Sequence, residues 1–167
     1  MEIAAPFQVE VDGLTVEVGR WQDRGADSLA AQSNVVMASE EEAKDHFIER
    51  DGVVFAGTHL LLDLWDATHL DDLALMERTL RDIVAQCGAT LLHIHLHHFT
   101  PSGGISGVAV LAESHISVHT WPERDYAAFD VFMCGDAQPE NAVPVLKRAF
   151  FPKRLEVTEE LRGRVPE

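Results

Sequence analysis

The stretch Leu111-Ala-Glu-Ser-His-Ile-Ser-Val-His-Thr-Trp-Pro-Glu123 joins two strand-like segments of the chain. Residues 107–113 form an apolar run, and residues 115–120 alternate between apolar and polar side chains. Such alternation is typical of a strand with one buried face. The Glu113-Ser114 bond therefore falls in a short connection between two neighbouring strands, which predicts an antiparallel pair.

Four further segments outside this stretch also have strand patterns: residues 59–65, 90–99, 127–134 and 153–158. Within residues 90–99, alternation places one set of side chains on each face, with Leu92, Ile94 and Leu96 opposite His93, His95 and His97. Adjacent strands with short connections favour an antiparallel sheet.

Two helices are expected between these strands. Apolar residues recur at helical spacing from Leu70 to Val84, with Asp71 and Asp72 at the favourable amino-terminal end and Gly88 as the stop. Residues 139–151 suggest a second helix, although Pro144 weakens that pattern. The predicted fold class is α+β, a two-layer sandwich with an antiparallel sheet and helices on one face.

Residues 1–50 differ in character and are expected to form an N-terminal extension to a domain at residues 51–167. Residues 7–18 alternate around Asp12-Gly13, which is a hairpin signal. A polar linker over residues 22–34 follows. Ser39 and Glu42 fit a capping box, which predicts a short helix over residues 40–49.

Composition limits the classes of partner. The 167 residues are 46% hydrophobic and 25% charged, as in a soluble globular protein, and the net charge of -15 argues against nucleic acid or an anionic membrane. The charge is compatible with a cationic small molecule. The N-terminus has no basic region and no long apolar stretch, so we expect no signal peptide, and no apolar run approaches the length of a membrane span. Cys87 and Cys134 are far apart and form no C-x-x-C motif, which favours two thiols in a reducing cytoplasm over a structural disulfide.

Ser114 lacks the G-x-S-x-G elbow of common hydrolases, but its hydroxyl can attack its own preceding carbonyl and cut the chain. A base would then remove the Cα proton, and hydrolysis would leave a pyruvoyl group that forms a Schiff base with an amine. His119 can be that base and Cys134 a proton donor. Judged by spacing alone, the more common interpretations are structural: Ser114 as a serine in a turn, His119 as a histidine in the core and Cys134 as a small buried side chain.

Residues 101–123 and 126–135, read together, resemble the prokaryotic S-adenosylmethionine decarboxylase proenzyme family. Residues 59–65 and 70–72 also match its opening strand and helix. The resemblance covers roughly residues 57–158, and its motifs are long and nearly uninterrupted.

The resemblance implies a self-processing decarboxylase that converts S-adenosylmethionine to the aminopropyl donor of spermidine synthesis. It implies cytoplasmic dimers of αβ units with active sites at the interface. The implied roles are cleavage between Glu113 and Ser114, a pyruvoyl cofactor from Ser114, processing by His119 and Ser106, proton donation by Cys134, adenine stacking on Phe99 and ribose binding by Glu123.

Two departures and three alternatives remain at this point, and one departure is that the N-terminal 50 residues lie outside the match. Gly103-Gly104 is a one-residue insertion relative to the family, which could shift Phe99 relative to Ser106. The same pyruvoyl chemistry could act on arginine or ornithine. A protein of another class could bind zinc with His93, His95 and His97, or those residues could simply form a polar strand face. A non-enzymatic subunit would be expected to lack Ser114, His119 or Cys134.

Overall fold

The computed structural model describes residues 8–11, 14–17 and 47–165. The chain divides into two units, residues 1–40 and residues 41–167. In the first unit, β1 (Gln8–Val11) pairs antiparallel with β2 (Leu14–Glu17). This pairing confirms the hairpin predicted around Asp12-Gly13. The linker predicted over residues 22–34 lies outside the described residues.

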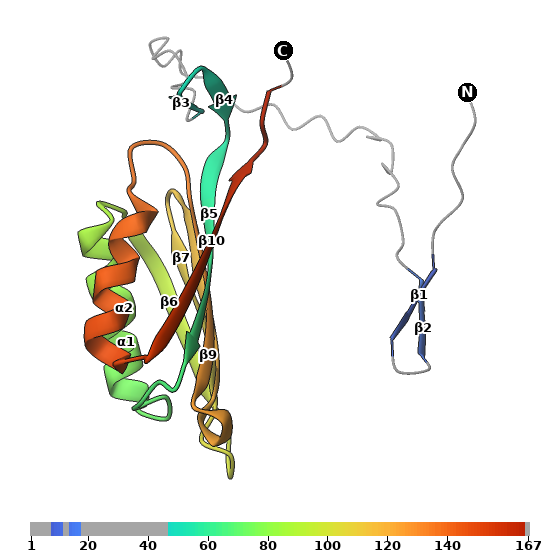
Figure 1. The fold of residues 1–167 in the computed structure, drawn as a ribbon, viewed down its shortest axis with the longest axis vertical. Coiled ribbons are helices and arrows are strands. Elements are labelled where there is room, and N and C mark those ends of the chain that lie inside the picture. Colours follow the sequence, from blue (N-terminus) through green and yellow to red (C-terminus); the bar gives the residue numbers. More distant parts are fainter. Residues whose placement is uncertain (1–7, 12–13, 18–46, 166–167) are drawn as a thin grey trace, which may run out of the picture. The chain divides into compact units, whose positions relative to one another are not determined.

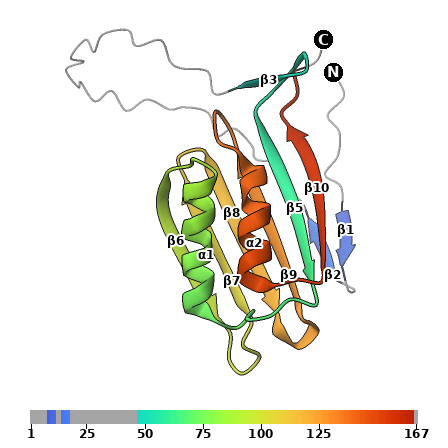
Figure 2. The ribbon, with the colours of Figure 1, turned by 60° about the vertical axis from the view of Figure 1, so that its left-hand side comes forward.

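A six-stranded antiparallel sheet and two helices build the second unit. The sheet order is β10-β5-β9-β8-β7-β6, and every neighbouring pair is antiparallel. The strands are β5 (Gly57–Trp65), β6 (Leu91–His98), β7 (Ile105–Leu111), β8 (Ser114–Trp121), β9 (Tyr126–Met133) and β10 (Arg154–Arg162). Helices α1 (Leu73–Gln86) and α2 (Ala142–Phe150) cover one face of this sheet (Figures 1 and 2), as predicted.

The hydrophobic core lies between the helices and the sheet. Every second residue of the central strands enters it, including Leu62, Ile116 and Phe129, while Met76 and Phe150 enter from the helices. Neither of the two described helices lies on the opposite face of the sheet, which we call the open face. Among the described residues, no helix is long and apolar enough to cross a membrane.

The helix boundaries follow from local chemistry. The Asp72 side chain accepts a hydrogen bond from the Leu75 N–H (2.8 Å), which caps α1. Gly88, with φ of 70°, follows the end of that helix. Pro144 lies in the first turn of α2, where a missing N–H removes no hydrogen bond of the helix. The 3₁₀ segments Pro122–Arg124 and Pro139–Asn141 precede β9 and α2.

The short helix predicted over residues 40–49 is wrong where the structure describes it. Ile48–Arg50 forms strand β3, which pairs with β4 (Val53–Phe55). The two residues between them, Asp51 and Gly52, have φ values of 54° and 78°, as a two-residue hairpin turn requires. The Asp-Gly pair was a hairpin signal that outweighs the capping box. Residues 40–46 lie outside the described residues.

The predicted face of Leu92 is also wrong. A β-bulge separates Leu91 from His93 in the pairing with β7, so the alternation shifts at this point. Leu91 packs against the core together with Ile94 and Leu96, whereas Leu92 is 63% exposed.

Candidate functional site

The carbonyl of Glu113 lies in the turn between β7 and β8, where two donors from one residue reach it. The backbone N–H of Cys134 donates to this oxygen at 3.1 Å, and the Cys134 thiol donates to it at 3.0 Å. Cys134 comes directly after β9, which pairs with β8 along its whole length. The pairing of these strands therefore polarises the carbonyl that precedes Ser114.

Ser114 has a backbone conformation that side-chain-bearing residues rarely adopt. Its φ is 150°, although it takes part in the pairing of β8 with Leu111 and Met133. Such a conformation is retained only where surrounding contacts enforce it, and it is concentrated at functional sites. The Ser114 hydroxyl lies 3.1 Å from Nδ1 of His115, an imidazole that can accept its proton.

The side chain of Glu113 anchors the residue before the serine. Its carboxylate accepts a hydrogen bond from the Thr90 N–H (2.8 Å), and the Ala112 N–H donates to the Thr90 carbonyl (3.0 Å). These bonds tie the turn to the start of β6, so the backbone around the Glu113-Ser114 bond is held from both sides.

A second group of predicted site residues lies at the other end of the sheet. His119 on β8 is directly opposite Ser106 on β7, which in turn faces His97 on β6. Directly paired residues project to the same face of a sheet, here the open face. The Phe99 ring lies 4.5 Å from that of His97 and 6.2 Å from that of His119.

Gly103 and Gly104, which the sequence suggested as the site of an insertion, lie in the loop between β6 and β7. The Phe99 N–H donates to the Gly104 carbonyl (2.7 Å), and the Gly103 N–H donates to the Phe99 carbonyl (2.8 Å). Gly103 has φ of 77°, and a Cβ on Gly104 would lie 2.9 Å from the Thr120 carbonyl oxygen. Both positions therefore require glycine. The loop leaves Phe99 beside His97 and His119, the two histidines that face Ser106.

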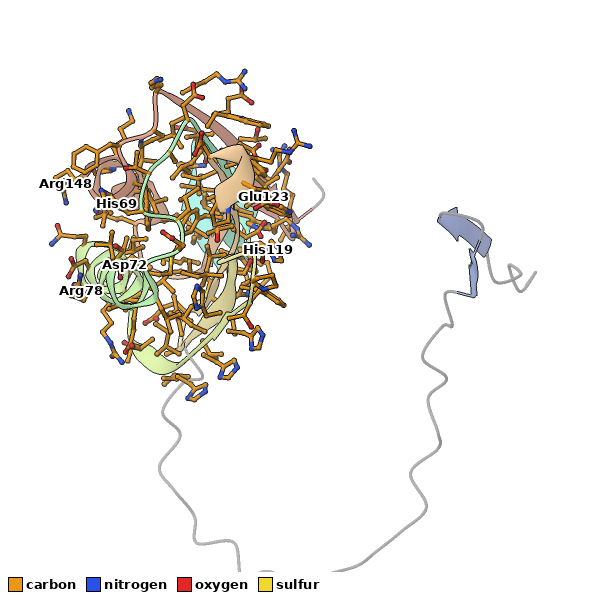
Figure 3. All side chains as sticks on the ribbon, turned by 90° about the horizontal axis from the view of Figure 1, so that it is seen from below. His69, Asp72, Arg78, His119, Glu123 and Arg148 are labelled. Carbon is orange, nitrogen blue, oxygen red and sulfur yellow. The ribbon has the colours of Figure 1, made fainter. Side chains whose placement is uncertain are left out.

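Glu123 belongs to the 3₁₀ segment that follows β8, and it is exposed. Figure 3 shows Glu123 and His119 on the side of the sheet away from the helices. The carboxylate thus lies at the same end of the sheet as Ser106, His119 and Phe99.

Sequence reasoning missed a row of aromatic side chains that continues from His119. The ring of Trp121 lies 4.3 Å from His119 and 5.2 Å from Tyr126, and Tyr126 lies 4.3 Å from Trp65. Burial and the hydrogen bond from its hydroxyl to Asp63 raise the pKa of Tyr126 to about 12. The available signal was the placement of Trp65, Trp121 and Tyr126 at strand ends of the predicted sheet.

The two groups are far apart within one chain. Ser114 and His119 are five residues apart on the same strand. At about 3.3 Å per residue, roughly 17 Å of extended chain separates them. The structure therefore unites Glu113, Ser114 and Cys134 at one end, and Phe99, Ser106, His119 and Glu123 at the other.

The metal-binding alternative finds no support. His93, His95 and His97 lie on the edge strand β6, where all three are exposed. Across the described part of the chain, no three histidine, cysteine or carboxylate side chains are grouped so as to hold a metal ion.

Comparison with known proteins gives a consistent result. A protein-family model described as S-adenosylmethionine decarboxylase matches residues 58–163. The S-adenosylmethionine decarboxylase proenzyme of Thermomicrobium roseum is 46% identical over 110 residues, which cover 65% of this chain and 95% of the relative. That of Methanococcus aeolicus is 46% identical over 114 residues, covering 66% and 97%. The crystal structure of the adenosylmethionine decarboxylase from Aquifex aeolicus has a TM-score of 0.59 at 33% identity, and covers 68% of this chain and 95% of its own.

Proposed function

Since this chain belongs to the S-adenosylmethionine decarboxylase family, it decarboxylates S-adenosylmethionine, and we propose that it does so with a pyruvoyl group made from its own Ser114. The product is the aminopropyl donor used in polyamine synthesis. Nothing in the comparisons supports arginine or ornithine as the substrate. The presence of Ser114, His119 and Cys134 also disfavours a non-enzymatic subunit.

The observation that carries the proposal is the pair of hydrogen bonds on the Glu113 carbonyl. When the Ser114 hydroxyl attacks this carbon, negative charge develops on the oxygen that already accepts from the Cys134 N–H and thiol. Donors in place before the reaction stabilise such a charge without reorganisation. The φ of 150° at Ser114 also supports the attack, because conversion of the amide to an ester relieves a disfavoured conformation.

The next step removes the Cα proton of Ser114. The bond between Cβ and Oγ of Ser114 then breaks, and Glu113 leaves as a carboxylate. The dehydroalanine that remains tautomerises to an imine, which water hydrolyses to release ammonia. The cut yields chains of residues 1–113 and 114–167. The pyruvoyl group supplies an electron-withdrawing carbonyl that bonds to the substrate amine. The Cys134 thiol contacts the carbonyl directly before Ser114, the residue that becomes this group, which supports its role as proton donor to the substrate carbon.

We propose that His119 and Ser106 act on the Ser114 of a second chain. A separation of roughly 17 Å along β8 keeps His119 from reaching the Cα proton of its own chain. The open face presents side chains that a second open face could cover, and an antiparallel arrangement of two copies brings one chain's His119 end to the other's Ser114 end. The functional unit is then a homodimer in which each active site uses both chains.

The substrate would bind at the end that carries Phe99 and Glu123. An aromatic face suits a purine and a nearby sulfonium cation, and a carboxylate accepts hydrogen bonds from ribose hydroxyls. The contact of Phe99 with His119 supports a shared pocket for the two residues. Trp121 and Tyr126 extend the same aromatic surface. We further propose that residues 51–167 form the catalytic domain and that residues 1–50 are an extension to it, of which residues 41–50 belong to the same compact unit as that domain.

Intact mass spectrometry of the purified protein tests the processing claim. We expect two chains that correspond to residues 1–113 and 114–167, the second with an N-terminal pyruvoyl group. The Ser114→Ala variant should remain one chain, because it lacks the attacking hydroxyl. Only full-length wild-type chain after long incubation would contradict self-processing.

A further inference from the structure

The helix layer contains a groove that the decarboxylation chemistry does not use. It has a volume of about 370 Å³ and lies between α1 and α2. Its apolar lining comes from Leu75, Val145 and Ala149. A concave volume of this size is within the range of small-molecule sites in proteins.

The polar lining of the groove is rich in arginine. Arg78 and Arg81 contribute from α1 and Arg148 from α2, so three of the 13 lysine and arginine residues of an acidic chain meet in one place. Arg81 forms an ion pair with Glu77 (2.6 Å). Among the described residues, neither Arg78 nor Arg148 has an ion pair or hydrogen bond. Two guanidinium groups from different helices therefore present unused donors to the same groove.

Guanidinium groups in this arrangement suit an anion with several oxygens. The planar fork of arginine donates two parallel hydrogen bonds to phosphate or carboxylate. The carboxylate of Asp82 also lines the groove and repels an anion, so the ligand needs enough charge to overcome it. A phosphate group meets this requirement better than a single carboxylate, and the apolar lining can contact the organic part of a phosphate ester.

The groove is separate from the decarboxylase site. Figure 3 shows Arg78 and Arg148 on the helix side, and His119 and Glu123 on the opposite side of the sheet. Packing of two open faces would leave the helix layer in solvent. We propose that the α1–α2 groove binds a small phosphate-bearing ligand, with Arg78 and Arg148 contacting the phosphate oxygens.

Isothermal titration calorimetry on the full-length protein at constant ionic strength tests this site with three probes: pyrophosphate, adenosine monophosphate and citrate. We expect saturable binding of a phosphate probe at one site per chain. Because hydrogen bonds to charged groups are strong, Arg78→Gln and Arg148→Gln should each weaken it roughly tenfold or more. Asp82→Asn should tighten it by removing the repelling carboxylate.

Lys147→Gln is the matched control, because Lys147 is exposed on the same helix as Arg148 but does not line the groove. It removes the same charge and should change the affinity less than about twofold. Equal weakening by Lys147→Gln and Arg148→Gln would show diffuse attraction and overturn the proposal. Non-saturable phosphate binding, or saturable binding of citrate alone, would overturn it as well.

Discussion

The Cys134 thiol is assigned to two successive steps, and they respond differently to its removal. The backbone N–H of residue 134 still donates to the Glu113 carbonyl in Cys134→Ala, so the chain should still be cut. Decarboxylation should fall about 100-fold or more, because the proton donor is absent. Mass spectrometry measures the first effect and release of CO₂ from S-adenosylmethionine measures the second.

Cys87→Ala is the control for loss of a thiol, because Cys87 is buried in the core away from Ser114. It should retain both processing and turnover. Full activity of Cys134→Ala would remove that residue from the proton-donor role.

Because of Cys87, we expect the unfolding free energy of the protein to fall at alkaline pH. Burial, followed by the nearby Glu140 carboxylate, raises its pKa from 9.0 to about 11. Between these values the unfolded chain loses a proton that the folded chain keeps, so stability present below pH 9 falls as the pH approaches 11. The contribution is at most about 3 kcal/mol.

Urea unfolding at pH 8 and pH 10.5 measures this effect. The difference in unfolding free energy between the two conditions should be smaller in Cys87→Ala than in the wild type. An equal difference in the two proteins would mean that Cys87 is not responsible.

The sequence identified Ser114 and Cys134 by resemblance, but not their contact. The hydrogen bonds to the Glu113 carbonyl depend on the register of β8 with β9, which brings together residues 21 positions apart. Spacing along a chain does not specify such a register. The separation of His119 from Ser114, by contrast, follows directly from placing both on one strand.

At the level of the elements, the Asp72 cap of α1 makes a measurable contribution to the stability of the folded protein. Asp72→Ala removes the acceptor for the Leu75 N–H and should lower the unfolding free energy by about 1 kcal/mol. Asp71→Ala is the matched control, because Asp71 is an exposed neighbour outside the cap. Thermal unfolding of both variants should show the larger decrease for Asp72→Ala, and equal decreases would argue against the cap.

Most elements of the described sheet were predictable, because their patterns are long and repeat regularly. Helix α1 combined a periodic apolar face with a cap and a stop at Gly88. The failures concern short features: three-residue strands such as β3, and the bulge that exposes Leu92. A bulge adds one residue without changing composition, so alternation alone does not reveal it.

At the level of the whole molecule, two inactive variants should restore processing in each other. In a mixed dimer of Ser114→Ala and His119→Ala chains, one site combines an intact Ser114 with an intact His119 from the other chain. The His119→Ala chain should therefore be cut when the two are produced together. Each variant alone should remain uncut, since both of its sites lack one group.

Mass spectrometry of the co-purified chains, each with a different tag, identifies which chain is cut. Absence of cleavage in a verified mixed dimer would contradict the shared site. Cleavage of the His119→Ala chain when it is produced alone would contradict the role of His119.

The position of β5 in the sheet has a consequence for the protein after its chain is cut. This strand precedes the proposed cut, yet it lies between β9 and β10, which both follow it. The two pieces are therefore interleaved in one sheet and stay together after the bond breaks. The Glu113 carbonyl, at the proposed cut, meets its two donors only when β8 and β9 are in register. A copy in which these strands are out of register would therefore remain uncut and would lack the pyruvoyl carbonyl. Only correctly folded chains would then become active.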